Sequence, residues 1–183
     1  MRRNGKNNRT RVMTEGGLMI ALSVLLSQIK VYEMANGGSV TAGSMIPILL
    51  YAMRWGTLPG MFIGSLYGVL KFMLEPNFYY PIQFLLDYPI PFALLGLAGI
   101  GYIYKNEDSM KQNVLIVTGV TLGIFGRFVS HVLSGAIFFA EYSGGKNPWL
   151  YSIGYNATYL VPELIISVII LLLIWKPIKN IDA

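Results

Sequence analysis

Residues 149–175 read WLYSIGYNATYLVPELIISVIILLLIW, and Glu163 is the only charged residue in this stretch. A helix that crosses the hydrocarbon core of a bilayer needs about 20 predominantly apolar residues, and the stretch is longer than that. The rest of the chain has the same character, since 54% of its 183 residues are hydrophobic and 13% are charged. A typical soluble domain carries about 25% charged residues. The composition therefore predicts an integral membrane protein that lies in a lipid bilayer.

Five further apolar segments precede residues 149–175, and together the six predict an all-α bundle of six transmembrane helices. We expect a single membrane domain over residues 1–183, which begins with a basic cytoplasmic segment at residues 1–11. The second apolar segment is short for a hydrocarbon core about 30 Å thick. The expected helices cover residues 12–29, 43–53, 58–74, 81–104, 112–140 and 149–175.

Lysine and arginine set the orientation, because cytoplasmic loops of membrane proteins carry an excess of both. If the N-terminus is inside, ten of the 14 basic residues lie on the cytoplasmic side and Arg127 lies within a helix. Only Lys30, Lys71 and Lys146 lie outside. The count predicts that both termini are cytoplasmic. It also explains the net charge of +5 without nucleic acid, so we expect no nucleic-acid partner.

Several kinds of chemistry are excluded by what the sequence lacks. The chain has no cysteine and one histidine, which excludes a thiolate metal site and a cysteine nucleophile and argues against a catalytic metal. It contains no G-x-x-x-x-G-K-[ST] loop for ATP and no H-E-x-x-H or G-x-S-x-G motif. No inverted repeat of the kind found in secondary transporters is visible. We therefore expect a binding subunit without catalytic activity and without a cofactor.

Polar residues from three expected helices lie at one depth. Counted from the outer surface, Asp87, His131 and Asn156 lie roughly 9, 13 and 10 Å deep. An ionisable side chain at bilayer depth costs roughly 2.5–3.5 kcal/mol and usually faces a cavity. A carboxylate beside aromatic rings suits a planar organic cation; the alternatives are interfacial anchoring for each ring and a packing role for the histidine. The rings at or near this depth belong to Tyr88, Phe138, Phe139, Tyr151, Tyr155 and Tyr159.

Two further patterns concern contacts between helices. Arg127 and Glu163 lie roughly 20 and 21 Å deep on consecutive antiparallel helices. We expect them to form a structural ion pair, because a buried charge needs a partner. Gly17 and Ala21 form a small-x-x-x-small pattern in the first helix, which allows another helix to approach closely.

Taken in order, these fragments resemble the thiamine-specific substrate-binding (S) component of energy-coupling-factor (ECF) vitamin transporters, over residues 14–175. The fragments are Thr14-Glu15-Gly16-Gly17; Gly38-Ser39-Val40 with Ser44-Met45-Ile46-Pro47; Pro81-Ile82-Gln83 with Asp87-Tyr88-Pro89; Arg127-Phe128-x-x-His131-x-x-x-Gly135-x-Ile137-Phe138-Phe139; and Tyr151 with Asn156. The resemblance implies a bacterial cell-membrane protein that captures thiamine near its outer face. It also implies three partners, a transmembrane coupling subunit and two cytoplasmic ATPases, with Gly17 and Ala21 on the surface that meets the coupling subunit.

The resemblance also implies roles for individual residues. Asp87 would hydrogen-bond the aminopyrimidine of thiamine or balance its cation, where family members usually carry glutamate. His131 and Phe139 would flank the rings, and Gly135 would let the ligand approach the backbone. The loop at residues 31–42 would order as a lid on binding. The other substrate-binding residues are expected to be Tyr32, Tyr88, Tyr151 and Asn156.

Three other functions remain open at this point. The first is an S component for a different vitamin or a thiamine precursor, although Asp87 argues against an anionic ligand. The second is a small membrane transferase that uses Asp87 and His131 as acid and base; no nucleophile or metal site accompanies that pair. The third is a structural scaffold, which leaves a carboxylate at bilayer depth unexplained.

Overall fold

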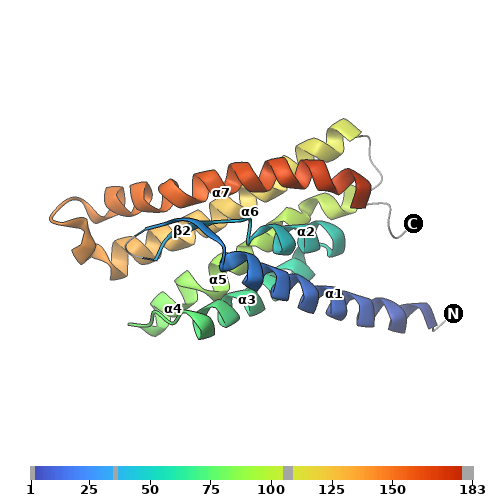
Figure 1. The fold of residues 1–183 in the computed structure, drawn as a ribbon, viewed down its shortest axis with the longest axis horizontal. Helices are drawn as coiled ribbons and strands as arrows, with labels where there is room; N and C mark the ends of the chain where they lie inside the picture. The colour runs from blue at the N-terminus through green and yellow to red at the C-terminus, as the bar shows by residue number, and fades with distance from the viewer. Residues whose placement is uncertain (1–2, 35–36, 105–108, 179–183) are drawn as a thin grey trace.

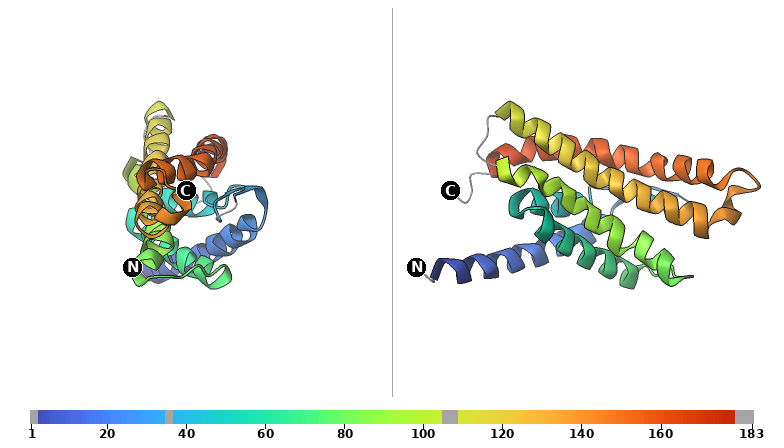
Figure 2. Two further views of the ribbon diagram at one scale, coloured as in Figure 1. Left: turned by 90° about the vertical axis from the view of Figure 1, so that its left-hand side faces the viewer. Right: turned by 180° about the vertical axis from the view of Figure 1, so that it is seen from behind.

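The computed structural model describes residues 3–34, 37–104 and 109–178. Figure 1 shows an elongated helical bundle in which α1 begins and α7 ends at the same end, as the basic residues predicted. Seen from behind in Figure 2, α6 and α7 lie side by side along their length. The elements are α1 (Arg3–Ser27), β1 (Lys30–Glu33), β2 (Ser39–Thr41), α2 (Ile46–Trp55), α3 (Thr57–Leu74), α4 (Pro81–Asp87), α5 (Pro89–Leu94), η1 (Leu95–Tyr104), α6 (Ser109–Phe138), η2 (Ala140–Ser143) and α7 (Pro148–Ile178).

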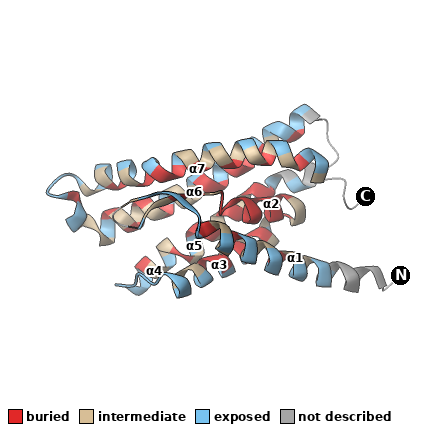
Figure 3. Cartoon of the chain, in the orientation of Figure 1, coloured by how far each residue is buried: buried red, intermediate tan, exposed pale blue. Residues whose placement is uncertain are grey.

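Within the described residues, five helical segments are long and apolar enough to cross a membrane. They are Arg9–Ser27, Thr57–Leu74, Pro81–Ile100, Met110–Phe138 and Pro148–Ile178. The expected second transmembrane helix exists as α2, but its 10 residues give a length of only about 15 Å. Its residues from Ile46 to Met53 are all buried, and Figure 3 shows them at the centre of the bundle. α2 is therefore a buried core helix, shorter than the five long apolar segments.

The fourth expected helix, residues 81–104, is not continuous. It divides into α4, α5 and the 3-10 helix η1, and the first break falls at Tyr88, with φ −121° and ψ −80°. Pro89 disfavours helical geometry in the residue before it, and a proline also lacks the N–H that a helix needs. The predicted apolar span is present as Pro81–Ile100, and Pro89 and Pro91 account for its interruption.

Glycines on one face of α3 hold the broken segment in place. A Cβ atom on Gly64 would collide with the carbonyl oxygen of Phe92, and one on Gly68 would collide with that of Tyr88. Small residues at this spacing let two helix backbones approach closely. The close approach sets the α4–α5 break, and with it the side chain of Asp87, at a defined distance from α3.

The region between α1 and α2 contains a short hairpin that the sequence analysis treated as a loop. β1 and β2 pair antiparallel with the register Lys30↔Thr41, Tyr32↔Val40 and Glu33↔Ser39. Gly37, at φ 89°, takes a conformation that L side chains rarely adopt. The backbone N–H of Gly38 donates to the Tyr155 hydroxyl at 2.9 Å. The hairpin is thus attached to α7.

Candidate functional site

A cavity of about 590 Å³ lies between the hairpin, the α4–α5 break, α6 and α7. This volume falls within the range of about 300–1,000 Å³ that is typical of small-molecule sites. Seven of the eight residues predicted to bind substrate line it together: Asp87, Tyr88, His131, Gly135, Phe139, Tyr151 and Asn156. The structure therefore brings residues of α4, α6 and α7, and of the turns that follow α4 and α6, to one cavity.

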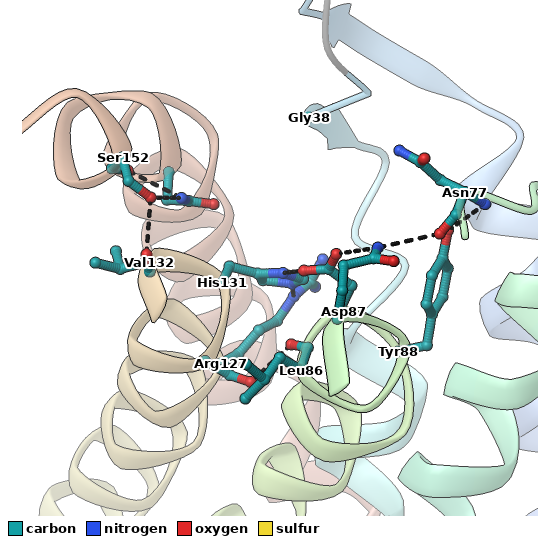
Figure 4. A network of polar contacts seen from close by, with 12 residues as sticks. Gly38, Asn77, Leu86, Asp87, Tyr88, Arg127, His131, Val132 and Ser152 are labelled. Carbon is teal, nitrogen blue, oxygen red and sulfur yellow. Dashed lines mark hydrogen bonds and ion pairs between the residues drawn. The ribbon is translucent and has the colours of Figure 1, made fainter. Parts of the chain in front are cut away.

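Asp87 lies at the centre of a chain of polar contacts, shown in Figure 4. Gln83 Nε2 donates to Asp87 Oδ2 at 2.6 Å, and His131 Nδ1 lies 3.4 Å from Asp87 Oδ1. On the other side of the imidazole, Arg127 Nε donates to His131 Nε2 at 3.2 Å. A guanidinium nitrogen can only donate, so Nε2 must accept. His131 is therefore neutral in this arrangement, with its proton on Nδ1 facing Asp87.

Aromatic rings line the same cavity as Asp87. Tyr151, Tyr155 and Tyr159 recur at every fourth position of α7, so they share one face of that helix. Adjacent rings are in contact, with centroids 6.1 Å apart in both pairs, and the Tyr159 ring lies 6.5 Å from that of His131. Phe139 lies against Tyr79 at 5.7 Å. A cation in the cavity would face a carboxylate on one side and ring surfaces on the other.

Two of the predicted polar ligands already use their polar atoms within the protein. The Tyr88 hydroxyl donates to the Glu75 carbonyl and accepts from the Asn77 N–H, both at 3.0 Å, which fixes the loop between α3 and α4. Asn156 Nδ2 donates to the Ser152 carbonyl at 2.9 Å, and Asn156 Oδ1 accepts from the Tyr159 hydroxyl at 2.6 Å. These two side chains shape the cavity by holding their neighbours.

Gly135 lines the cavity, but its missing side chain serves the contact between α6 and α7. A Cβ atom there would collide with Ser152 Oγ. That hydroxyl donates to the Val132 carbonyl at 3.0 Å and ties the two helices together. The space beside Gly135 is thus occupied by α7 rather than left for a ligand.

Tyr32 does not belong to the cavity. Its side chain is 54% exposed on β1, where it borders a separate depression on the outside of the hairpin. Ser39 and Thr41 of β2 line the cavity instead. Phe138 likewise lies outside the cavity and contacts Tyr80.

The expected ion pair between Arg127 and Glu163 is not formed. Arg127 bonds His131, and its guanidinium carbon lies 4.4 Å from the centroid of the Phe92 ring. Glu163 Oε1 accepts from both the N–H and the hydroxyl of Thr41, each at 2.6 Å. Equal depth does not decide which face of a helix a residue occupies, and β2 supplies the partner of Glu163. Both charged residues nevertheless line the cavity.

Gly17 and Ala21 are exposed on α1, and no atom of the described residues lies within 4 Å of where a Gly17 Cβ would be. The small-residue pattern therefore faces away from the bundle. Four residues of the hairpin region also line the cavity and were not predicted as ligands because the hairpin was not predicted: Gly37, Gly38, Ser39 and Thr41. The Gly37-Gly38 pair between Val31 and Val40 was the signal that could have predicted a turn between strands.

A multi-pass helical membrane protein whose cavity is lined by carboxylates and several aromatic rings has the features of a protein that binds a small organic molecule. The family described as "Thiamine transporter protein (Thia_YuaJ)" matches residues 13–182, so the chain belongs to this family of thiamine transporters. The membership confirms the predicted class: a bacterial multi-pass membrane protein with a transport function and no catalysis.

Individual relatives agree with this assignment. The "Thiamine transporter ThiT" of Bacillus subtilis (strain 168) is 36% identical over 172 residues, which cover 89% of each chain. The protein of the same name from Lacticaseibacillus paracasei is 25% identical over 169 residues, covering 87% of this chain and 84% of that one. A solved structure of ThiT from Listeria monocytogenes superposes with a TM-score of 0.81 at 22% identity, covering 94% and 97% of the two chains. This last likeness supports the all-α membrane fold.

Proposed function

We propose that the chain binds thiamine in the cavity beside Asp87 and serves as the substrate-binding S component of an ECF-type uptake transporter. The observation that carries the proposal is a carboxylate, Asp87, in a cavity that several aromatic rings also line. The Asp87 side chain is 18% exposed and that of His131 is 13% exposed. A charge held there without a cationic partner of its own favours a cationic ligand.

The charge balance of the cavity supports a ligand with one positive charge. Its charged lining residues are Lys71, Glu75, Asp87, Arg127 and Glu163. Two positive and three negative groups leave a formal charge of −1 when His131 is neutral. Lys71 and Glu75 neutralise one another at 2.8 Å, so the excess lies with the buried carboxylates. Thiamine carries one permanent positive charge on its thiazolium ring and would restore neutrality.

The proposed roles follow from the geometry. Asp87 balances the thiazolium charge, and His131 offers its ring beside the cation. Phe139 and Tyr151 provide ring surfaces for stacking. Because Asp87 is already oriented by Gln83 and His131, little ordering is needed on binding, and preorganised sites bind more tightly.

Energy for release must come from partners in this proposal. The sequence contains no phosphate-binding loop, so ATP hydrolysis is assigned to two cytoplasmic ATPases that act through a membrane coupling subunit. The exposed α1 surface at Gly17 and Ala21 is the proposed contact with that subunit, because small residues allow a second helix to approach closely.

The proposal is tested by titrating thiamine into the detergent-solubilised protein while tryptophan and tyrosine fluorescence is followed. We expect sub-micromolar, saturable binding of thiamine and no response to riboflavin or biotin. Binding of riboflavin or biotin in place of thiamine would overturn the assignment of the ligand. Transport is tested separately: Gly17→Leu should leave thiamine binding intact and abolish copurification with the coupling subunit.

A further inference from the structure

Glu163 has one carboxylate oxygen that the protein does not satisfy. The residue is 2% exposed, and its Oε1 accepts from the Thr41 N–H and hydroxyl. Its Oε2 has no hydrogen-bond partner among the described residues, although Glu163 lines the cavity. An unsatisfied buried acceptor costs about 1–3 kcal/mol, and more when it is charged. Such an atom in a binding cavity points to a donor that arrives with the ligand.

The other polar groups of the cavity do not offer the same opportunity. Asn156 and Tyr88 have their polar atoms bonded within the protein. Asp87 receives Gln83 on Oδ2 and faces His131 with Oδ1. Among the buried polar side-chain atoms of the described residues that line the cavity, Glu163 Oε2 is the one without a hydrogen-bond partner, and the side chain is oriented because Thr41 holds Oε1.

The depth of Glu163 and the positive charge of Arg127 indicate which part of the ligand lies beside Glu163. Arg127 is one helical turn, roughly 6 Å, deeper than His131. Glu163 is roughly 10 Å deeper along α7 than Asn156. A thiazolium ring placed on this floor would face the Arg127 guanidinium, which repels it. The aminopyrimidine ring of thiamine is neutral and presents an amino donor next to a ring-nitrogen acceptor.

We infer that Glu163 and Arg127 form a deep subsite for the aminopyrimidine, in which Glu163 accepts a hydrogen bond from its 4′-amino group. This inference rests on the proposed function, since it names the residues that recognise one end of thiamine. Arg127 faces the adjacent ring nitrogen with its guanidinium, while its Nε remains bonded to His131. Glu163 thereby determines specificity for an amino group over an oxo group.

The test compares thiamine with oxythiamine, which carries an oxo group in place of the 4′-amino group and keeps the same thiazolium. The wild type should bind thiamine at least about 10-fold more tightly, because an oxo group places a second acceptor opposite Glu163. Glu163→Gln should weaken thiamine binding by about 10- to 100-fold and reduce or reverse the preference. The glutamine amide can donate to the oxo group while its oxygen keeps Thr41.

A matched control separates this inference from the proposed function. Asp87→Asn should weaken both ligands by similar factors and keep the preference for thiamine, because both carry the same cation. A wild type that binds neither ligand overturns the proposed function. A wild type that binds thiamine, together with a Glu163→Gln protein that keeps the wild-type preference, overturns the inference alone.

A second variant provides the test if the Glu163→Gln protein does not fold. Glu163→Asp keeps the charge and should retain the preference for thiamine while both ligands bind more weakly. If neither variant folds, the wild type still decides, because equal affinity for the two ligands would show that no acceptor recognises the amino group.

Discussion

The carboxylate near the basic end of the bundle and the carboxylates of the cavity differ in how fully their oxygens are hydrogen-bonded. Near the basic end, Glu15 of α1 is saturated: it accepts from Arg11 Nε at 3.0 Å and from Trp55 Nε1 at 2.8 Å, and it lies 3.1 Å from Arg54 Nε. Farther from that end, Asp87 and, near the middle of α7, Glu163 line a cavity, and Glu163 Oε2 has no partner among the described residues. The Glu15 carboxylate, bonded on both oxygens, joins helices, whereas a cavity carboxylate with an unpartnered oxygen is a candidate contact for a ligand.

The largest expected effect is the loss of thiamine affinity when Asp87 of the cavity is replaced. Asp87→Ala should weaken thiamine binding by about 100-fold or more, because the cation then enters a cavity without its counter-charge. Titration by fluorescence or calorimetry measures the change. The thermal unfolding midpoint without thiamine should stay close to that of the wild type, because Gln83 and His131 are the only partners of Asp87 among the residues that the structure describes. Unchanged affinity would place the ligand elsewhere.

A substitution at the basic end should have the opposite pattern, lowering stability without changing thiamine affinity. Glu15→Gln should lower the free energy of unfolding by about 1–3 kcal/mol, since it removes the charge that joins α1 to the end of α2. Thiamine affinity should remain within about twofold of the wild type. Chemical denaturation in detergent gives the first quantity, and the titration gives the second. A large loss of affinity at normal stability would mean that the two ends are not separable in this way.

The smallest effect is expected at Tyr32. Its ring is 54% exposed on the outer face of β1, so Tyr32→Ala should change thiamine affinity by less than about threefold. Tyr151→Ala is the matched comparison, because the same residue type lines the cavity there, and it should weaken binding by about 10-fold. Equal losses in the two variants would show that the hairpin turns its outer face to the ligand.

Sequence reasoning located the cavity better than it located individual contacts. Asp87, His131 and Asn156 could be placed in one layer because helical rise is regular, and the structure has all three lining one cavity. The same depth argument failed for Arg127 and Glu163, because depth along two helices does not specify which faces meet. Tyr32 was misplaced for a related reason: the hairpin was not predicted, so the alternation of its side chains could not be used.

The remaining differences arise from tertiary contacts that one sequence does not reveal. The partner of Glu163 is Thr41, which is 122 positions away and lies in a strand of three residues. The break at Tyr88 could have been predicted from Pro89 and Pro91, but its position against Gly68 of α3 depends on packing. Local signals thus indicate where the chain bends, and long-range contacts decide what each bend faces.

The central claim is tested most directly by a structure of the protein with thiamine bound. We expect the thiazolium ring in the cavity within about 4–6 Å of the Asp87 carboxylate, among the rings of His131, Phe139 and Tyr151. Thiamine bound outside this chamber, or in it with Asp87 turned away from the cation, would contradict the account.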